Sequence, residues 1–283
     1  MIYPNQAQSS ADVAEHYDEL DPFYREVWGD HVHHGYWATG RETPELAVVA
    51  LVDLIADRLG VEPGHRVCDI GCGYGATAQR LAEAYGAHVT GLTISPVQAQ
   101  GAFARAVGSD ALRFVCQDWL ANTFADEVFD RAISTESSEH MADKVGFFRE
   151  ACRTLKPNGR LAVAAWLTRD QPRSWEVRHL LEPICREGRL PSMGTEAEYR
   201  AFAASAGLQV TGFEDLSDRV ERTWMVCARR VALKLLTRPS YRRFLLDGRS
   251  KNRIFALGLL RLLVAYRTGS IRYGLLTAEK VSH

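Results

Sequence analysis

Apolar and polar residues follow two different rhythms along the chain, and together they predict a sheet flanked by helices. Short apolar runs predict seven strands, at residues 66–70, 88–92, 112–116, 129–135, 160–166, 208–216 and 271–279. Between them, apolar residues recur at helical spacing, most clearly over 43–59, 77–85, 144–155 and 196–206. This regular alternation indicates an α/β fold with a doubly wound, parallel sheet, in which ligands bind at the carboxyl ends of the strands.

The same patterns divide the chain into three parts. Residues 1–42 are expected to form an N-terminal helical lid, with a helix that begins near Ala11. Residues 43–170 contain the regular alternation and are expected to form the cofactor-binding core. Residues 171–283 contain Pro- and Gly-punctuated helical patches and apolar helical pieces such as 254–266, which precede the last predicted strand. We expect these pieces to form a substrate-binding helical cap inserted between the last two strands of the core.

A glycine-rich turn follows the first predicted strand and is the strongest candidate for a binding site. Gly71, Gly73 and Gly75 are separated by one residue each, and a helical pattern begins at Ala76. Glycine allows positive φ and a close approach between ligand and backbone. The helix that follows directs free N–H groups and the positive end of its dipole toward the ligand. A Rossmann-like sheet is therefore expected, although Gly71, Gly73 and Ala76 also fit the dinucleotide fingerprint.

Two features distinguish a dinucleotide from other ligands that this turn could bind. Asp69, two positions before the first glycine, would repel a pyrophosphate but suits a ligand with an amino group and a sulfonium. The second strand leads to Thr93, Ser95 and Gln98 and lacks the acidic residue with which nicotinamide enzymes bind ribose. These neutral side chains offer hydrogen bonds to ribose hydroxyls instead. The sequence therefore disfavours a dehydrogenase.

The ends of the next two predicted strands carry further candidates. Asp118 and Trp119 follow the third strand, where a carboxylate accepts a hydrogen bond from an adenine amino group and an aromatic ring stacks on the base. Thr135 and Glu136 lie where the fourth strand ends. In a sheet of this kind these residues meet the glycine turn at the carboxyl edge.

The motif 67–75 resembles the first motif of class I S-adenosylmethionine-dependent methyltransferases. Segments 28–36, 136–144 and 269–280 are similar to the γ-tocopherol methyltransferase family, which includes small-molecule O-, N- and C-methyltransferases. The resemblance implies S-adenosyl-L-methionine as the cofactor. The cofactor contacts predicted from the resemblance and the strand ends are Tyr17, His33, Asp69, Gly71, Gly73, Gly75, Thr93, Ser95, Gln98, Asp118, Trp119, Thr135 and Glu136.

The chain is also similar to cyclopropane and mycolic acid synthases, through residues 91–98 and the pair Glu139 and His140. Those enzymes hold a bicarbonate with a cysteine, a glutamate and a histidine. By this resemblance Glu139 is the counterpart of the glutamate, whereas His34 occupies the cysteine position and residues 164–166 of the fifth strand contain no histidine. These departures argue against cyclopropanation of an alkene.

Three residues are candidates for catalysis. Methyl transfer from a sulfonium is an in-line displacement, so a base is needed only when the acceptor retains its proton. His140 is the first candidate, since a histidine near pH 7 takes a proton from a hydroxyl or an activated carbon acid. Glu139 is a candidate to orient His140, and His34 is an alternative base from the lid. A helix-capping or packing role is the alternative for His140.

His31, His33 and His34 fall within four residues and raise the question of a metal site. No second cluster of cysteines, histidines or paired carboxylates accompanies them, so no metal is expected. Together with Trp28 and Tyr36 they fit a lid whose ring faces shield a sulfonium. Ordinary packing of the aromatic rings is the alternative.

Composition agrees with a globular enzyme, with 46% apolar and 24% charged residues. The six cysteines form no C-x-x-C pair, the first ten residues lack an export signal, and no apolar run approaches the ~20 residues of a membrane span. We therefore expect a cytoplasmic protein with reduced thiols. The net charge of −1 conceals 14 Lys and Arg against two acids between residues 219 and 272. Such a basic segment fits an anionic substrate, a membrane surface or a solvated helical face.

From the sequence we expect a methyltransferase that acts on a small, largely apolar natural product of secondary metabolism, at carbon, oxygen or nitrogen. The alternatives are a lipid-modifying enzyme of the cyclopropane synthase type, an NAD-dependent oxidoreductase, a catalytically silent cofactor-binding protein and a nucleic-acid methyltransferase. Apolar runs within the basic segment favour a hydrophobic pocket over nucleic acid. A hydrophobic small molecule is the expected partner, without nucleic acid or stable membrane insertion, and a homo-oligomer is compatible with the sequence.

Overall fold

The computed structural model describes residues 1–246 and 255–281, and one seven-stranded sheet forms its centre. The strands are β1 (Arg66–Ile70), β2 (His88–Thr93), β3 (Leu112–Cys116), β4 (Phe129–Thr135), β5 (Leu155–Thr168), β6 (Leu208–Asp215) and β7 (Ile271–Lys280). Their order across the sheet is β3-β2-β1-β4-β5-β7-β6. The strands appear where the apolar runs predict them, and the doubly wound α/β class is confirmed.

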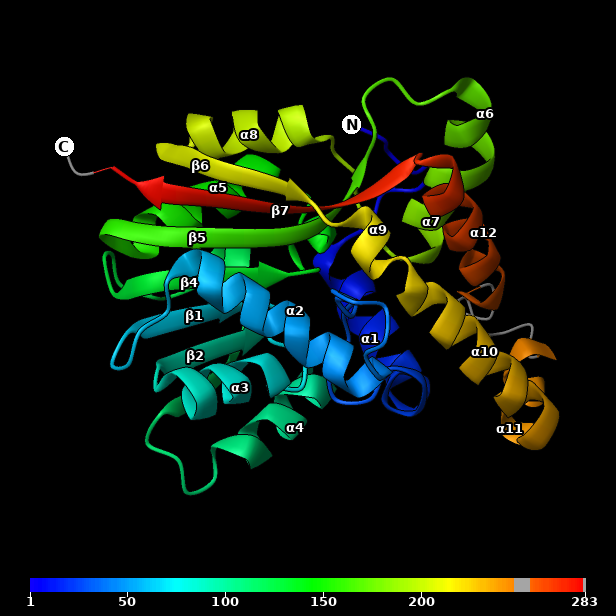
Figure 1. Cartoon of the computed structure of the whole chain (residues 1–283), viewed down its shortest axis with the longest axis horizontal. Helices are drawn as coiled ribbons and strands as arrows, with labels where there is room; N and C mark the ends of the chain where they lie inside the picture. The colour runs from blue at the N-terminus through cyan, green and yellow to red at the C-terminus, as the bar shows by residue number, and fades with distance from the viewer. Residues whose placement is uncertain (247–254, 282–283) are drawn as a thin grey trace.

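Helices cover both faces of this sheet (Figure 1). The longer ones are α1 (Ser10–Val27), α2 (Pro44–Leu59), α3 (Ala76–Tyr85), α4 (Pro96–Ala106), α5 (Lys144–Thr154), α8 (Glu196–Ser205), α10 (Arg222–Thr237), α11 (Pro239–Leu246) and α12 (Phe255–Thr268). The shorter segments are η1 (Trp119–Ala121), η2 (Ser138–His140), α6 (Ser174–Glu176), η3 (Val177–Leu181), α7 (Glu182–Glu187) and α9 (Ser217–Val220). The predicted helix 254–266 corresponds to α12, and its first residue, Ile254, lies outside the described residues.

Successive residues of the central strands enter two separate hydrophobic cores. Val67 and Ala162 pack with α2 and α3 in one core, whereas their neighbours Cys68 and Leu161 pack with α5 and α8 in the other. This is the two-residue period of a strand that is buried on both faces. It explains why the central strands read as continuous apolar runs rather than as alternating ones.

Local sequence signals set the two ends of helix α2. The side chain of Thr43 accepts a hydrogen bond from the backbone N–H of Leu46, and Pro44 occupies the first helical position. Gly60 ends the helix in the left-handed conformation, with φ of 60°. The helix therefore covers the range that the apolar spacing predicts.

The expectation of a wholly parallel sheet needs one correction. β1 to β5 pair in parallel, but β7 runs antiparallel to both of its neighbours, β5 and β6. Thr168, the last residue of β5, pairs with Ile271, the first residue of β7. The chain thus re-enters the sheet at its carboxyl edge and must run back along β5. This pairing extends β5 to Thr168, beyond the predicted end at residue 166, whereas its earlier start at Leu155 pairs with Phe129 of β4.

Helices α9 to α12 follow β6 and precede β7 in the chain. Figure 1 shows α1, α10 and α12 beyond the carboxyl ends of the parallel strands. Phe23 of α1 packs edge-to-face against Tyr241 of α11, with ring centroids 4.9 Å apart. Among the described residues, no helix combines the length and the apolar character that crossing a membrane requires. The six cysteines are free thiols.

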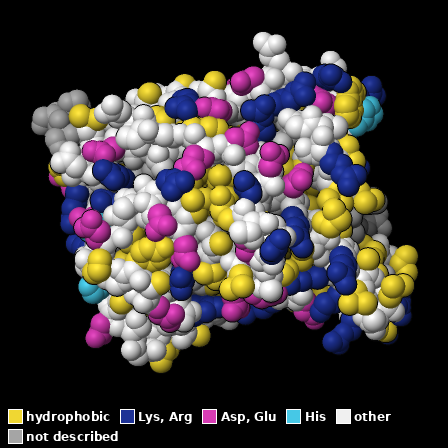
Figure 2. Space-filling model, in the orientation of Figure 1, with side chains coloured by type: hydrophobic (Ala, Val, Ile, Leu, Met, Phe, Trp, Pro, Cys, Tyr) yellow, Lys and Arg dark blue, Asp and Glu magenta, His cyan; other side chains and the backbone are white. Residues whose placement is uncertain are grey.

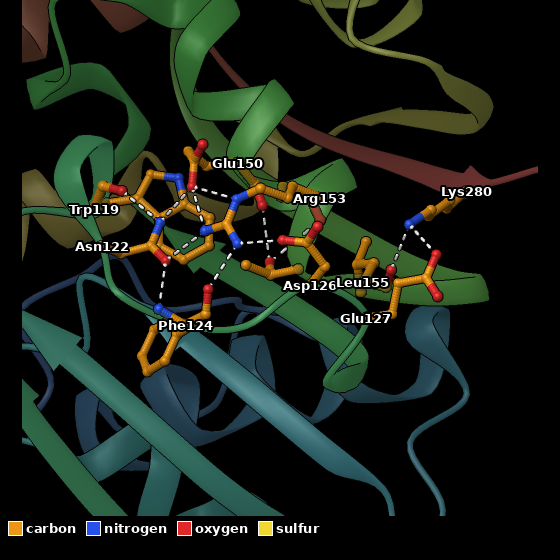
Figure 3. A network of polar contacts seen from close by, with 11 residues as sticks. Trp119, Asn122, Phe124, Asp126, Glu127, Glu150, Arg153, Leu155 and Lys280 are labelled. Carbon is orange, nitrogen blue, oxygen red and sulfur yellow. Dashed lines mark hydrogen bonds and ion pairs between the residues drawn. The ribbon is translucent and has the colours of Figure 1, made fainter.

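Arg153 of α5 joins that helix to the loop that follows β3 (Figure 3). Its guanidinium donates to Glu150 at 2.6 Å, to the carbonyl oxygen of Phe124 at 2.6 Å and to the amide oxygen of Asn122 at 2.9 Å. The amide of Asn122 in turn donates to the carbonyl oxygen of Trp119 at 2.8 Å. The network therefore holds the chain segment that follows the end of β3 at the carboxyl edge.

We expect Arg153→Met to lower the free energy of unfolding by about 1–3 kcal/mol, because it leaves several partly buried acceptors without a donor. Arg149→Met, at an exposed position of the same helix, should change it by less than about 0.5 kcal/mol. Urea denaturation of both variants measures the difference. Equal losses in the two variants would contradict a specific role for the network.

Candidate active site

The glycine turn after β1 has the conformation that its sequence predicts. Gly71, Gly73 and Gly75 have φ of 79°, 54° and 80°, all in the left-handed region. A Cβ on Gly71 would lie 2.2 Å from the Cβ of Ser137, at the end of the neighbouring strand. Gly71 therefore tolerates no side chain, for reasons of both conformation and space.

A cleft of about 710 Å³ opens beside this turn at the carboxyl edge of the sheet. It is lined by ten of the residues that the sequence singles out, namely Tyr17, Gly71, Gly73, Thr93, Gln98, Asp118, Trp119, Thr135, Glu136 and His140. An adjoining hollow of about 330 Å³ is lined by the predicted residues His33, Asp69, Gly71, Gly73 and Thr135. The topology thus gathers side chains from four strand ends and from helix α1 around one space.

Asp69 is the buried acid of this hollow. It is 2% exposed, and its Oδ2 atom has no hydrogen-bond partner. Burial raises the pKa of its carboxyl to about 7, partly offset by a hydrogen bond from the backbone of Ala78. Because this pKa lies above its ordinary value, Asp69 stabilises the fold only at acidic pH and loses that contribution as the pH rises through 7. A buried orphan carboxylate oxygen beside a bare glycine turn fits the ammonium group of a ligand.

The polar lining of the cleft is already organised by internal hydrogen bonds. Thr93 donates to the amide oxygen of Gln98 at 2.9 Å, which leaves the Gln98 NH₂ group as a donor. Asp118 accepts from the hydroxyl of Ser10 at 2.8 Å and from the backbone N–H of Leu120 at 2.9 Å. Adenine binding at Asp118 would therefore compete with, or add to, the contact from Ser10 of α1.

Four predicted residues line neither the cleft nor the adjoining hollow, namely Ser95, Gly75, His34 and Glu139, the last of which is described below. Ser95 caps α4 through the backbone N–H of Gln98 and is hydrogen-bonded to Asp18 of α1. Gly75 is the N-cap of α3, where a Cβ would meet the ring of Phe114 at 2.7 Å. His34 is fully buried behind the cleft and lines neither the cleft nor its adjoining hollow.

Glu136 is held by donors from three distant parts of the chain. Its Oε1 accepts from the backbone N–H of His34 at 2.7 Å and from the hydroxyl of Tyr273 at 2.8 Å, and its Oε2 accepts from the indole of Trp166 at 2.9 Å. The ring nitrogen Nδ1 of His34 lies 2.9 Å from Oε1. Burial raises the pKa of Glu136, but the electrostatic interaction and hydrogen bonds with His34, together with the nearby His33, outweigh it and lower the pKa to about 2. Glu136 is therefore a carboxylate at neutral pH, and it adopts φ of 54°, which is rare for a non-glycine residue.

His140 faces Tyr17 across the cleft. Its Nε2 lies 2.9 Å from the hydroxyl of Tyr17, and its Nδ1 lies 3.3 Å from the carbonyl oxygen of Arg189. A carbonyl oxygen only accepts, so this contact assigns the proton of the neutral ring to Nδ1 and leaves Nε2 as the acceptor. Burial lowers the pKa of His140 to about 4, which keeps the ring neutral at physiological pH.

Glu139 does not orient His140, so that part of the sequence interpretation is wrong. Its Oε1 accepts from the backbone N–H of Trp166 at 2.6 Å, and its Oε2 accepts from the hydroxyl of Ser138 at 3.1 Å. The partners of the His140 ring are Tyr17 and the Arg189 backbone, as described above. Burial raises the pKa of Glu139, and the nearby Glu136 raises it further.

An aromatic cavity of about 520 Å³ adjoins the cleft on the other side of Tyr17 and His140. It shares Tyr17, Val32, Glu136 and His140 with the cleft. Its further lining residues are Tyr24, Trp28, Glu139, Trp166, Gly188, Leu190 and Trp224. Sequence reasoning missed Trp166 and Trp224 as site residues, because buried aromatic residues in a strand and a helix give the same pattern whether they pack or bind.

The three histidines of the N-terminal segment contact one another and the backbone. Nδ1 of His31 lies 3.1 Å from Nε2 of His33, and Nδ1 of His33 lies 2.7 Å from the carbonyl oxygen of His34. Burial lowers the pKa of His31 to about 3 and also lowers that of His33. In the described part of the chain, no three histidine, cysteine or acidic side chains are arranged to hold a metal ion.

The Rossmann-like sheet, the bare glycine turn and the buried acid beside it define a class I S-adenosylmethionine-dependent methyltransferase. Residues 5–235 match the family model described as mycolic acid cyclopropane synthetase. The chain belongs to this family of S-adenosylmethionine-dependent methyltransferases. The class of enzyme and the cofactor expected from the sequence are thereby confirmed.

Individual relatives agree with this assignment. The chain is 30% identical to tocopherol O-methyltransferase, chloroplastic, of Arabidopsis thaliana, over 95% of this chain and 81% of the relative. It is 33% identical to 27-O-demethylrifamycin SV methyltransferase of Amycolatopsis mediterranei, over 77% of this chain and 81% of the relative. The structure of mycolic acid cyclopropane synthase CmaA1 complexed with SAH and CTAB matches the fold with a TM-score of 0.83, at 23% identity over 97% of this chain and 99% of that one.

The raised pKa of Asp69 predicts a pH-dependent affinity for S-adenosylhomocysteine. Below pH 7 Asp69 of the free protein is mostly protonated, so binding of an ammonium group must release a proton. We expect the affinity to rise with pH from 5 to 8, by up to about tenfold per unit on the acidic side. Isothermal titration calorimetry in buffers of different ionisation enthalpy measures both affinity and proton release.

Asp69→Asn should remove this pH dependence and weaken binding at pH 8. Asp110→Asn, at an exposed position away from the cleft, is the matched control and should leave both unchanged. An affinity that stays constant from pH 5 to 8 in the unmodified protein would contradict the assignment of Asp69.

Proposed function

We propose that this methyltransferase transfers the methyl group to a small, largely apolar acceptor that binds in the aromatic cavity. The observation that carries the proposal is the position of that cavity, which abuts the cleft beside the glycine turn across Tyr17 and His140. The acceptor atom is a carbon, oxygen or nitrogen, and the relatives that methylate tocopherol and a rifamycin precursor by name support a natural product as the substrate.

The residues of the cleft suit the parts of S-adenosylmethionine. Asp69 and the turn at Gly71 and Gly73 would hold the amino-acid end, and the neutral donor of Gln98 would hold the ribose. Asp118 would bind the adenine amino group. When bound, the cofactor supplies an electrophilic methyl group on a sulfonium. The ionised Glu136, at the border between cleft and cavity, places a negative charge where a positive ligand is expected.

The aromatic cavity suits an apolar acceptor, and a second pocket adjoins it. This pocket, of about 490 Å³, lies between α1, α10, α11 and α12 and is lined by apolar and aromatic residues, with Tyr24 and Trp28 also lining the aromatic cavity. An acceptor with an apolar tail would bury it there, since burial of apolar area provides affinity without directional contacts.

His140 and Tyr17 provide the proton transfer that an acceptor hydroxyl or carbon acid requires. In the neutral tautomer Nε2 accepts a proton while the Arg189 carbonyl holds Nδ1–H. The acceptor proton passes to Nε2, directly or through the hydroxyl of Tyr17, as the acceptor atom takes the methyl group. His34 is a weaker candidate for the base, because its two ring nitrogens face Glu136 and the hydroxyl of Tyr266 at 3.1 Å.

We propose that residues 1–42 act as a lid, 43–170 as the cofactor-binding core and 171–283 as the acceptor-binding cap with the last two strands. Three polar contacts tie α1 to the core, from Ser10 to Asp118, from Asp18 to Ser95 and from Asp21 to Tyr74. They support a helix that closes over bound cofactor. A cytoplasmic location is our proposal as well, in keeping with the six free thiols.

A lipid-modifying reaction of the cyclopropane synthase type is the second candidate. The family match favours it, and Glu139 lines the aromatic cavity. The absence of a histidine at residues 164–166 and the engagement of His34 by Glu136 and Tyr266 argue against it. Both reactions add the same mass, so they are distinguished by product NMR, where a new methyl signal differs from a cyclopropane methylene signal.

The proposed function predicts methylated products from a panel of apolar phenols, polyketide alcohols, prenylated quinols and amines. Purified protein with S-adenosylmethionine should yield products heavier by one CH₂ unit for apolar members and none for water-soluble analogues of the same head group. Mass spectrometry detects the products. Binding of S-adenosylhomocysteine without turnover of any apolar acceptor would instead support a catalytically silent protein.

We expect His140→Ala to lower kcat by about 10²–10⁴-fold for a hydroxyl or carbon-acid acceptor, as removal of a general base does. The Kd for S-adenosylhomocysteine should change little, because the Nε2 atom faces Tyr17 rather than the glycine turn. His88→Ala, at an exposed position, is the control. Because the pKa of His140 is about 4, activity should be lost only as the pH falls toward 4 and not near 6.5. Unchanged kcat in His140→Ala would remove the base assignment.

A further inference from the structure

The solvent side of helix α10 combines exposed apolar side chains with arginines. Met225, Leu233 and Leu236 are 55%, 61% and 79% exposed, and Arg222 and Arg229 are exposed as well. At about 100° per residue, these positions fall within an arc of roughly 80°. They therefore form one stripe along the helix rather than a scatter of single residues.

The adjoining helix α11 carries the same two kinds of side chain. Leu246 is 82% exposed, and Arg242 and Arg243 are also exposed. Figure 2 shows apolar and basic side chains mixed at the corner of the molecule where Figure 1 places α10 and α11. We name the following residues the cap surface: Arg222, Met225, Arg229, Leu233, Leu236, Arg242, Arg243 and Leu246.

The charge of this region has one sign. Helices α10, α11 and α12 contain eight Lys and Arg and no acidic residue. Part of this charge is neutralised by other elements, since Lys234 pairs with Glu26 of α1 and Arg230 pairs with Glu45 of α2. Within residues 1–246 and 255–281, Arg229 and Arg243 make no ion pair. The cap surface thus keeps positive charge available for an outside partner.

The apolar exposure is concentrated in the same place. Four of the twelve large apolar side chains that are exposed among the described residues belong to the cap surface, and two more, Leu260 and Val264, lie on the following helix α12. Exposed leucines on a merely solvated face are unfavourable, and a patch of this kind marks an interaction site. A nucleic acid would pair with the arginines but leave the leucines in water. An anionic bilayer satisfies both, because arginines pair with headgroup phosphates and leucines enter the acyl boundary.

We propose that the cap surface binds the face of an anionic lipid bilayer. The protein lies on the membrane and does not span it. The proposal stands independently of the methyl acceptor, but it fits an apolar one, because the apolar pocket between α1, α10, α11 and α12 lies directly inside these helices. An acceptor dissolved in the bilayer would then have a short path to the aromatic cavity.

Co-sedimentation with vesicles tests the proposal on the full-length protein. Vesicles of phosphatidylcholine mixed with phosphatidylglycerol should bind it at least about tenfold more tightly than vesicles of phosphatidylcholine alone. Binding should weaken when salt is raised from about 0.15 M to about 1 M, which shortens the screening length from about 8 Å to about 3 Å. Equal binding to both kinds of vesicle, or binding to neither, would overturn the proposal.

Two double variants separate the apolar from the basic contribution. Leu233→Glu with Leu236→Glu should lower the affinity for anionic vesicles at least tenfold. Leu46→Glu with Val107→Glu is the matched control, since those side chains are 61% and 83% exposed but lie on other elements. A similar loss in the control would mean that net charge alone decides, and would contradict a specific surface.

Arg229→Glu with Arg243→Glu should abolish the preference for phosphatidylglycerol, whereas Arg113→Glu with Arg149→Glu, at exposed positions elsewhere, should leave most of it. Calorimetry with S-adenosylhomocysteine checks that each variant is folded and separates loss of membrane binding from failure of the cofactor site. Sedimentation velocity measures the oligomeric state of the protein and of the leucine variant. A dimer that the leucine variant dissociates would identify the cap surface as a contact between copies of this chain and overturn the proposal.

Discussion

The buried carboxylate of Glu136 is the interaction on which the site depends. Glu136 follows directly after β4. It accepts hydrogen bonds from His34 in the N-terminal segment, from Trp166 of β5 and from Tyr273 of β7. A buried charge is stable only when its hydrogen-bonding capacity is filled, so all three elements must dock together. One side chain therefore joins the first forty residues of the chain to its last strand. It also accounts for the positive φ at Glu136, since the surrounding donors over-determine that conformation.

Glu136 and Glu139 lie close together in the chain, but their pKa values shift in opposite directions. Both are buried, but Glu136 accepts hydrogen bonds from His34, Trp166 and Tyr273, and the contacts with His34 contribute most to lowering its pKa to about 2. Glu139 has fewer donors and a carboxylate nearby, and its pKa rises. The environments thus push the two pKa values apart, so that Glu136 ionises at a lower pH than Glu139.

The sequence predicts the core better than its surroundings, for a physical reason. The positions of the strands along the chain and the turn at Gly71 follow from local rules, because the apolar period and the glycines that permit positive φ lie in neighbouring residues. The antiparallel direction of β7 does not follow from local rules, since it results from where α12 returns the chain to the sheet. The partners of His140 do not follow from local rules either, because Tyr17 and Arg189 come to its ring from distant segments of the chain. The residues of the aromatic cavity share the pattern of core aromatics, and only three-dimensional contact separates the two.

Tyr17 connects helix α1 to His140, the residue that we propose as the base. Tyr17 lies on α1, and its hydroxyl contacts the one ring nitrogen of His140 that is free to accept a proton. The same helix reaches the cleft through Ser10, which donates to Asp118. A ligand bound at Asp118 would compete with, or add to, the contact from Ser10, which lies on the same helix as Tyr17. We therefore propose that the cofactor cleft and the contact between Tyr17 and His140 are coupled through helix α1.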